Sequence, residues 1–165
     1  MKTYFILVST KFPSTHKRKG EQTFFAEKIN EAAIPVTKSS ILGKKLHTIR
    51  ANYPLWEKRI AEVIAGNAVL SIRYHSLGRY VKGNQQIEFL RLDKDSGIGI
   101  QKISFFDSDI CCPYVYGNDG ISNEPISLLQ LTKNDGLEIL DFIDWFTKYD
   151  KSESMGIIHF TPFRY

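Results

Sequence analysis

The chain has 165 residues, 42% of them hydrophobic and 24% charged, with a formal net charge of +4 at pH 7. This size and composition predict one globular domain over residues 1–165 with a buried core, and no apolar run approaches the ~20 residues that a membrane-spanning helix needs. The only cysteines are the adjacent Cys111 and Cys112, which suit neither a disulfide framework nor a zinc site, so we expect a cytoplasmic protein without a metal or cofactor.

Hydrophobic periodicity predicts strands and helices in mixed order. In chain order, the predicted elements are a strand over residues 3–9, a polar loop over 12–21, a helix over 22–32, an extended segment over 46–50, a helix over 52–65, strands over 68–74, 85–92 and 99–106, an irregular region over 107–123, an extended segment over 126–131, a helix that ends at 149 and a strand over 156–160. The helix over 52–65 has the clearest signals, because Pro54 suits its first turn and Gly66 can end it. Thr132 and Asn134 are candidate N-caps of the last helix.

Side-chain spacing also predicts which surfaces face water. In the strand over 85–92, Ile87 and Phe89 alternate with Gln86 and Glu88, which predicts one exposed face. In the last helix, acidic residues repeat every three positions and predict a solvent-exposed ridge, formed by Glu138, Asp141 and Asp144.

Consecutive strands without a regular helix between them argue against a doubly wound parallel sheet. A small β-barrel decorated by two to three helices, in the α+β class, fits the order better. The sequence contains no P-loop, no G-x-G-x-x-G after a predicted strand, no H-E-x-x-H and no G-x-S-x-G. The large enzyme classes that carry these motifs are therefore disfavoured.

Positive charge is concentrated in the first third of the chain. Residues 1–60 hold twelve Lys/Arg and four Glu, whereas residues 61–165 hold ten Lys/Arg and fourteen Asp/Glu. The densest cluster is the segment Gly43-Lys44-Lys45-Leu46-His47-Thr48-Ile49-Arg50. An extended backbone places Thr48 and Arg50 on one face and Lys45 on the other, but a bend at Gly43 can return the lysine to the threonine. The cluster predicts an anionic partner, and the alternative is a solvated charged loop.

The pattern G-x-K-x-x-T-x-R, followed by a helix and a hydrophobic strand, resembles the signature of ASCH domains, a PUA-like group of small β-barrels. The end of the chain is similar to the close of these domains, with Asn134-Asp135-Gly136-Leu137, an amphipathic helix and the strand over 156–160. The resemblance makes residues 41–160 an ASCH-like core, preceded over 1–40 by a strand, a basic loop and a helix. The N-terminal Phe12-Pro13, His16 and Lys19-Gly20-Glu21 also resemble a subgroup found in phages and gut bacteria, which implies no function.

The resemblance implies a module that binds RNA, another nucleic acid or a nucleotide in a basic cleft. Lys45 and Arg50 would contact phosphate, and an aromatic residue such as Tyr74 or Tyr53 would stack on a base. The expected binding residues are Lys19, Lys44, Lys45, His47, Thr48, Arg50, Tyr53 and Tyr74.

The resemblance also implies an alternative, because small ASCH-family amidohydrolases act on acylated nucleosides such as N4-acetylcytidine. Thr48 would then be the nucleophile and Lys45, with a pKa lowered by desolvation, the base. Leu46 stands where the family motif has a further threonine. The acid of this site is open, and the candidates are Glu88 first, then Glu124 and Asp93.

Overall fold

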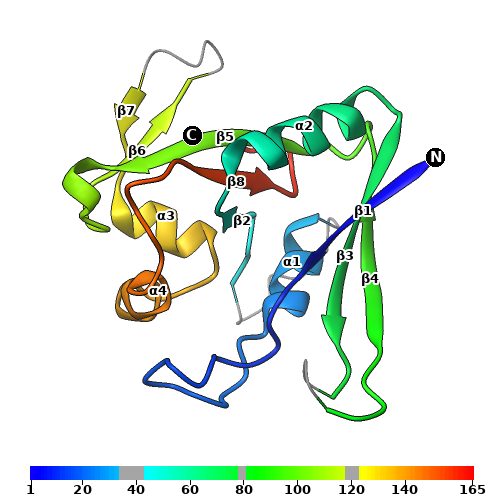
Figure 1. Cartoon of the computed structure of the whole chain (residues 1–165), viewed down its shortest axis with the longest axis horizontal. Helices are drawn as coiled ribbons and strands as arrows, with labels where there is room; N and C mark the ends of the chain where they lie inside the picture. Colours follow the sequence, from blue (N-terminus) through cyan, green and yellow to red (C-terminus); the bar gives the residue numbers. More distant parts are fainter. Residues whose placement is uncertain (34–42, 78–80, 118–122) are drawn as a thin grey trace.

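The computed structural model describes residues 1–33, 43–77, 81–117 and 123–165. The described strands form two sheets with four α-helices around them, which confirms the predicted α+β class (Figure 1). No described strand is hydrogen-bonded into both sheets, so the sheets do not close into the predicted barrel. None of the helices in the described ranges combines the length and apolarity needed to cross a membrane.

The small sheet has three strands in the order β1-β3-β4, with bounds β1 Lys2–Leu7, β3 Ala68–His75 and β4 Gln86–Leu92. The predicted first strand is confirmed. It pairs in parallel with β3, so that Tyr4 lies opposite Leu70 and Ile6 opposite Ile72. The N-terminal segment is therefore part of the same core as the rest of the chain.

The alternation predicted for β4 is interrupted by a bulge. Leu90 pairs with Ile72, but the next pair is Glu88 with Arg73, which leaves Phe89 as the extra residue. A bulge shifts the side-chain alternation by one position. Leu92 is consequently buried, and the regular two-face pattern predicted for this strand is wrong.

The large sheet is antiparallel, in the order β2-β8-β5-β6-β7. Its strands are β2 His47–Arg50, β8 Met155–His159, β5 Gly99–Phe105, β6 Pro113–Tyr116 and β7 Asn123–Pro125. β8 lies between β2 and β5 and is buried along its whole length. β6 falls inside the region expected to be irregular, and residues 118–122 of that region lie outside the described residues.

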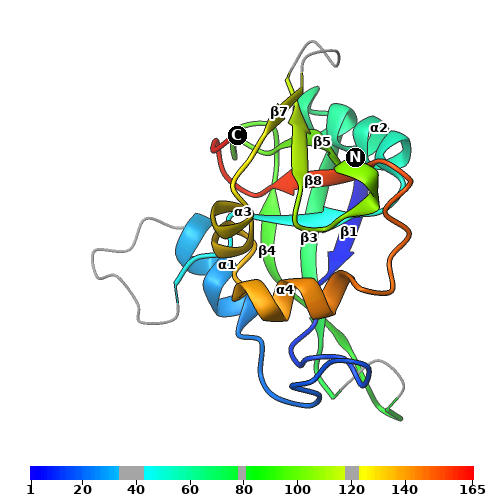
Figure 2. The same ribbon diagram turned by 90° about the vertical axis from the view of Figure 1, so that its left-hand side faces the viewer.

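Helix α2, Tyr53–Ile64, connects the two sheets, and α1, Phe25–Ala33, adds to the core. α2 contacts β3 of the small sheet and both β5 and β8 of the large one, and Figure 2 shows it along the upper end of the strands. Its start follows the expected chemistry, because the Asn52 side chain accepts a hydrogen bond from the Leu55 N–H at 3.2 Å. Ile60 and Val63 of α2 are fully buried. α1 buries Phe25 and Ile29.

The predicted last helix is two helices, α3 Leu128–Asn134 and α4 Ile139–Phe146. The expected extended segment over 126–131 is therefore wrong in its second half. Ser127 caps α3 by accepting from the Gln130 N–H, so Thr132 and Asn134 lie within α3 and are not N-caps. Gly136, with φ +75°, ends this first helix and turns the chain toward α4.

Candidate functional site

A groove of about 1130 Å³ lies where the two sheets, α2, α4 and the segment after β1 meet. Its charged lining residues are Lys11, Lys45, Arg50 and Asp135. Its aromatic lining includes Trp56, Tyr74, Trp145 and Tyr149. Cations and aromatic rings from distant parts of the sequence therefore share one concave surface.

The bend predicted at Gly43 is present, with φ +75°. Lys45 precedes the first strand residue, His47, and its backbone N–H donates to the Lys28 carbonyl at 3.1 Å. Because Lys45 lies outside the strand, strand alternation does not set its direction. Lys45, Thr48 and Arg50 consequently line the same groove.

The Lys45 ammonium is held inside the protein. Its Nζ lies 2.9 Å from Oδ1 of Asp135 and donates to the Asp135 main-chain oxygen at 2.5 Å. The same nitrogen sits 4.3 Å from the centre of the Phe25 ring, a cation–π contact. Lys45 is only 2% exposed and Asp135 only 4%. The ammonium therefore has a partner in each of three directions before any ligand binds.

Burial acts in opposite ways on the two groups. It lowers the pKa of Lys45, an effect that the nearby Asp135 carboxylate partly offsets. For Asp135, burial alone would raise the pKa, but Lys45 and His47 outweigh it and lower the pKa below the ordinary value. Asp135 is therefore a carboxylate at neutral pH.

A chain of hydrogen-bond donors leads to Asp135 from behind the groove. Asn134 Nδ2 donates to the Tyr165 hydroxyl at 3.1 Å, and that hydroxyl is 2.7 Å from Nε2 of His47. An amide nitrogen only donates, so the Tyr165 hydroxyl accepts from Asn134 and leaves its own hydrogen free for His47 Nε2, the arrangement that we expect. Neutral His47 then carries its proton on Nδ1, which lies 3.4 Å from Oδ1 of Asp135 without forming a hydrogen bond to it. Burial also lowers the pKa of His47, in agreement with a neutral ring.

Arg50 lies below the surface of the groove and forms no ion pair with an acidic side chain of the described residues, whereas Lys11 of the lining is exposed. The Arg50 Nη2 donates to the Leu7 carbonyl at 2.8 Å, whereas its Nε is buried with no hydrogen-bond partner in the described part of the chain. Burial lowers the pKa of Arg50, but a guanidinium stays protonated in proteins. The groove thus contains an uncompensated positive charge.

Three of the expected binding residues lie outside the groove and one lies behind it. Lys44 is exposed and lines a second cavity of about 880 Å³, and Lys19 is exposed on the N-terminal loop. The Tyr53 hydroxyl donates to Glu57 at 2.6 Å, and burial with this bond raises its pKa to about 12. His47 is fully buried behind Asp135.

The three acids proposed for the alternative site lie elsewhere in the molecule. Glu88 accepts hydrogen bonds from Arg91 and Ser71, which lower its pKa. Asp93 accepts from Ser96, and Glu124 is exposed on β7. None of them lines the groove. The acid beside Lys45 is Asp135. It belongs to the motif Asn134-Asp135-Gly136-Leu137 but was not among the candidate acids.

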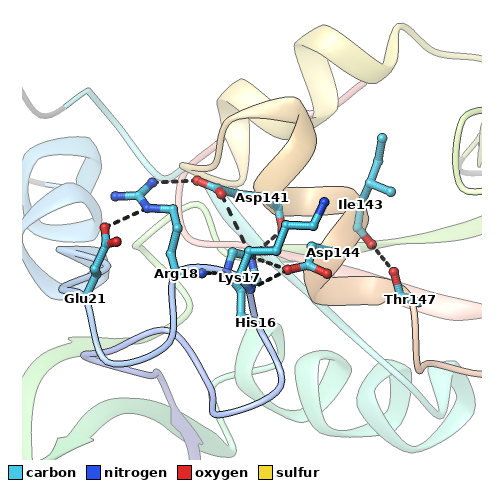
Figure 3. Close-up of polar contacts among 8 residues, drawn as sticks. All are labelled: His16, Lys17, Arg18, Glu21, Asp141, Ile143, Asp144 and Thr147. Carbon is cyan, nitrogen blue, oxygen red and sulfur yellow. Dashed lines mark hydrogen bonds and ion pairs between the residues drawn. The ribbon is translucent and has the colours of Figure 1, made fainter.

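Polar contacts form a clasp between the N-terminal loop and α4 (Figure 3). The Lys17 N–H donates to the Asp144 carboxylate at 2.7 Å, and Arg18 Nη1 donates to the Asp141 carboxylate at 2.6 Å. His16 Nε2 is 3.6 Å from Asp144. Asp141 and Asp144 therefore hold the loop, and the solvated ridge predicted for them is wrong; Glu138 alone of the three is exposed.

Among the residues described, no group of three His, Cys, Asp or Glu side chains is placed to hold a metal ion. Comparisons with protein-family models, with curated proteins and with solved structures each find no match.

Proposed function

We propose that this protein binds a nucleic-acid strand or nucleotide, RNA in particular, in the groove between the two sheets. The observation that carries the proposal is the Arg50 guanidinium, which lies in a concave surface with a buried, unpartnered Nε and no acidic partner among the described residues. A phosphate group would supply the missing counter-ion to the guanidinium.

The aromatic lining supports the same ligand class. Trp56, Tyr74, Trp145 and Tyr149 line the groove that contains Arg50. Stacking of a base on an aromatic side chain contributes about 1–3 kcal/mol per base in single-strand binding. A groove that offers a cation and several rings therefore matches a nucleotide unit better than a simple inorganic anion.

The ASCH resemblance supports this function as well. The motif that carries it, from Gly43 to Arg50, supplies three residues that line the groove, Lys45, Thr48 and Arg50. We propose that the chain is an ASCH-like, PUA-like domain whose barrel is here opened into two sheets.

The two tryptophans of the chain provide a direct assay, because both line the groove. Their fluorescence should change when a short single-stranded oligoribonucleotide binds. We expect Arg50→Ala to weaken binding at least about tenfold and to reduce the slope of log affinity against log salt by about 0.7. Lys58→Ala, an exposed lysine on α2 outside the groove, is the matched control for the lost charge. Equal affinity of the two variants would exclude the proposed role of Arg50.

A further inference from the structure

The charge of the groove is almost balanced at its base. Lys45, Arg50 and Asp135 are the charged groups of the groove lining that lie below its rim, whereas Lys11 is exposed at the edge. Lys45 and Asp135 form an ion pair at 2.9 Å. One surplus positive charge therefore remains at the base, and it belongs to Arg50.

The fold holds the Asp135 carboxylate in place. Asp135 faces Lys45 on one side and the Asn134–Tyr165–His47 donor chain on the other. Among the described residues, Asp135 is the single acidic side chain that lines the groove. Because this carboxylate pairs with Lys45, the ammonium of Lys45 is not available to a ligand that enters the groove.

We propose that Asp135 makes the groove selective for singly charged phosphodiesters over doubly charged phosphomonoesters. This inference rests on the proposed function. It identifies the ligand as a phosphodiester linkage within a nucleic-acid strand, in place of a free nucleoside monophosphate. A phosphodiester carries one negative charge, which Arg50 matches. A terminal phosphate carries up to two, and the second meets no free cation at the base because Asp135 already pairs with Lys45.

The pair of probes that isolates this difference is adenosine 5′-monophosphate and its phosphate methyl ester. They share base, sugar and phosphorus and differ in one negative charge at pH 8. Both are measured by competition with the bound oligoribonucleotide, read from tryptophan fluorescence, and the corresponding uridine pair controls for base preference. We expect the methyl ester to compete about tenfold better, a difference of about 1.4 kcal/mol.

A pH series on the unchanged protein gives a second measurement. The second phosphate pKa of a monoester is about 6, so at pH 5.5 much of the monoester is singly charged and the preference should shrink. The methyl ester keeps its charge over this range. Its own affinity therefore reports any titration of groove residues, including His75, which also lines the groove.

Asp135→Asn tests the role of Asp135 itself. It removes the negative charge of the carboxylate and leaves the positive charge of Lys45 without its partner. The preference should disappear or reverse, mainly because the monoester gains affinity. Thermal unfolding shows whether this variant folds, and the pH series decides the question if it does not.

Equal competition by the two probes at pH 8, a preference that persists at pH 5.5, or no competition by the methyl ester would each overturn the selectivity. Failure of the oligoribonucleotide to bind would instead refute the proposed function.

Discussion

Lys45 and Asp135 are 90 residues apart in the sequence, yet the Lys45 ammonium contacts both the carboxylate and the main-chain oxygen of Asp135. A backbone hydrogen bond from the Leu46 N–H to the Asn134 carbonyl, at 2.7 Å, runs beside this pair. The contact joins the segment before β2 to the end of α3. It thereby closes the base of the groove.

Removing one member of this pair should cost more stability than replacing both. Asp135→Asn leaves the Lys45 ammonium buried without its counter-ion, and we expect a loss of about 3–5 kcal/mol in the free energy of unfolding. The double variant Lys45→Met/Asp135→Leu fills the same space without charge and should lose less. Urea unfolding of the three proteins measures the difference. A double variant as unstable as Asp135→Asn would contradict the assignment of a desolvated ion pair.

The pair should also make stability depend on acid. The folded-state pKa of Asp135 is lowered from its ordinary value of 3.8, so its contribution is present above the unfolded pKa and is lost as pH falls through the folded pKa. Below about pH 4, the natural protein should therefore lose stability more steeply than the double variant. Parallel curves of unfolding free energy between pH 5 and pH 2 would show that Asp135 is not stabilised as an anion.

The donor chain makes a prediction about the proton of His47. The order of partners places it on Nδ1, with Nε2 accepting from Tyr165. Nitrogen-15 NMR of the imidazole distinguishes the two tautomers. We expect the Nδ1-protonated form in the natural protein and a change in its signals in Tyr165→Phe, while Tyr114→Phe, on β6, should leave them unchanged. Protonation on Nε2 would reverse the direction that we assign to the chain.

The clasp should control the mobility of the N-terminal loop. Asp144→Ala removes the acceptor of the Lys17 N–H and the carboxylate near His16, and we expect a cost of about 1 kcal/mol. Amide hydrogen exchange should accelerate at Lys17 and its loop neighbours. Glu153→Ala, an exposed acid before β8, is the control for charge. Unchanged exchange in the loop would show that Asp144 does not hold it.

The alternative activity is tested by incubation with N4-acetylcytidine. Lys45 would have to be neutral to take a proton from Thr48, but its ammonium is paired with Asp135, which opposes that role. We therefore expect the natural protein and Thr48→Ala to release acetate at the same background rate. Release by the natural protein that is lost in Thr48→Ala would favour the amidohydrolase over a pure binding module.

Local signals in the sequence predicted local features well. Pro54 and Gly66 bound α2 as expected, and the glycine bend at Gly43 brought Lys45 to the face of Thr48. The errors have local causes too. Ser127, and not the predicted Thr132 or Asn134, is the N-cap that begins α3, and the bulge at Phe89 changes the alternation of β4.

The set of residues that line the groove was harder to predict from the sequence. Hydrophobic spacing does not show which cation meets which acid, because such pairing depends on how elements 90 residues apart pack. Asp135 belongs to the motif Asn134-Asp135-Gly136-Leu137. Its neighbour Gly136 was the signal that a helix ends at this point and that Asp135 faces the interior. Trp145 was visible only as part of an amphipathic helix, and its place in the groove follows from the position of α4.

Arg50 belongs to the large sheet, but the carbonyl that anchors its guanidinium belongs to Leu7 at the end of the small sheet. The spacing between the two layers therefore sets how far this cation reaches toward a guest. Trimming a side chain such as Ile60, which is fully buried on α2, the helix that contacts both sheets, and lies outside the groove lining, should alter affinity without touching the ligand. We therefore expect the packing of the core to influence ligand affinity at a distance from the ligand.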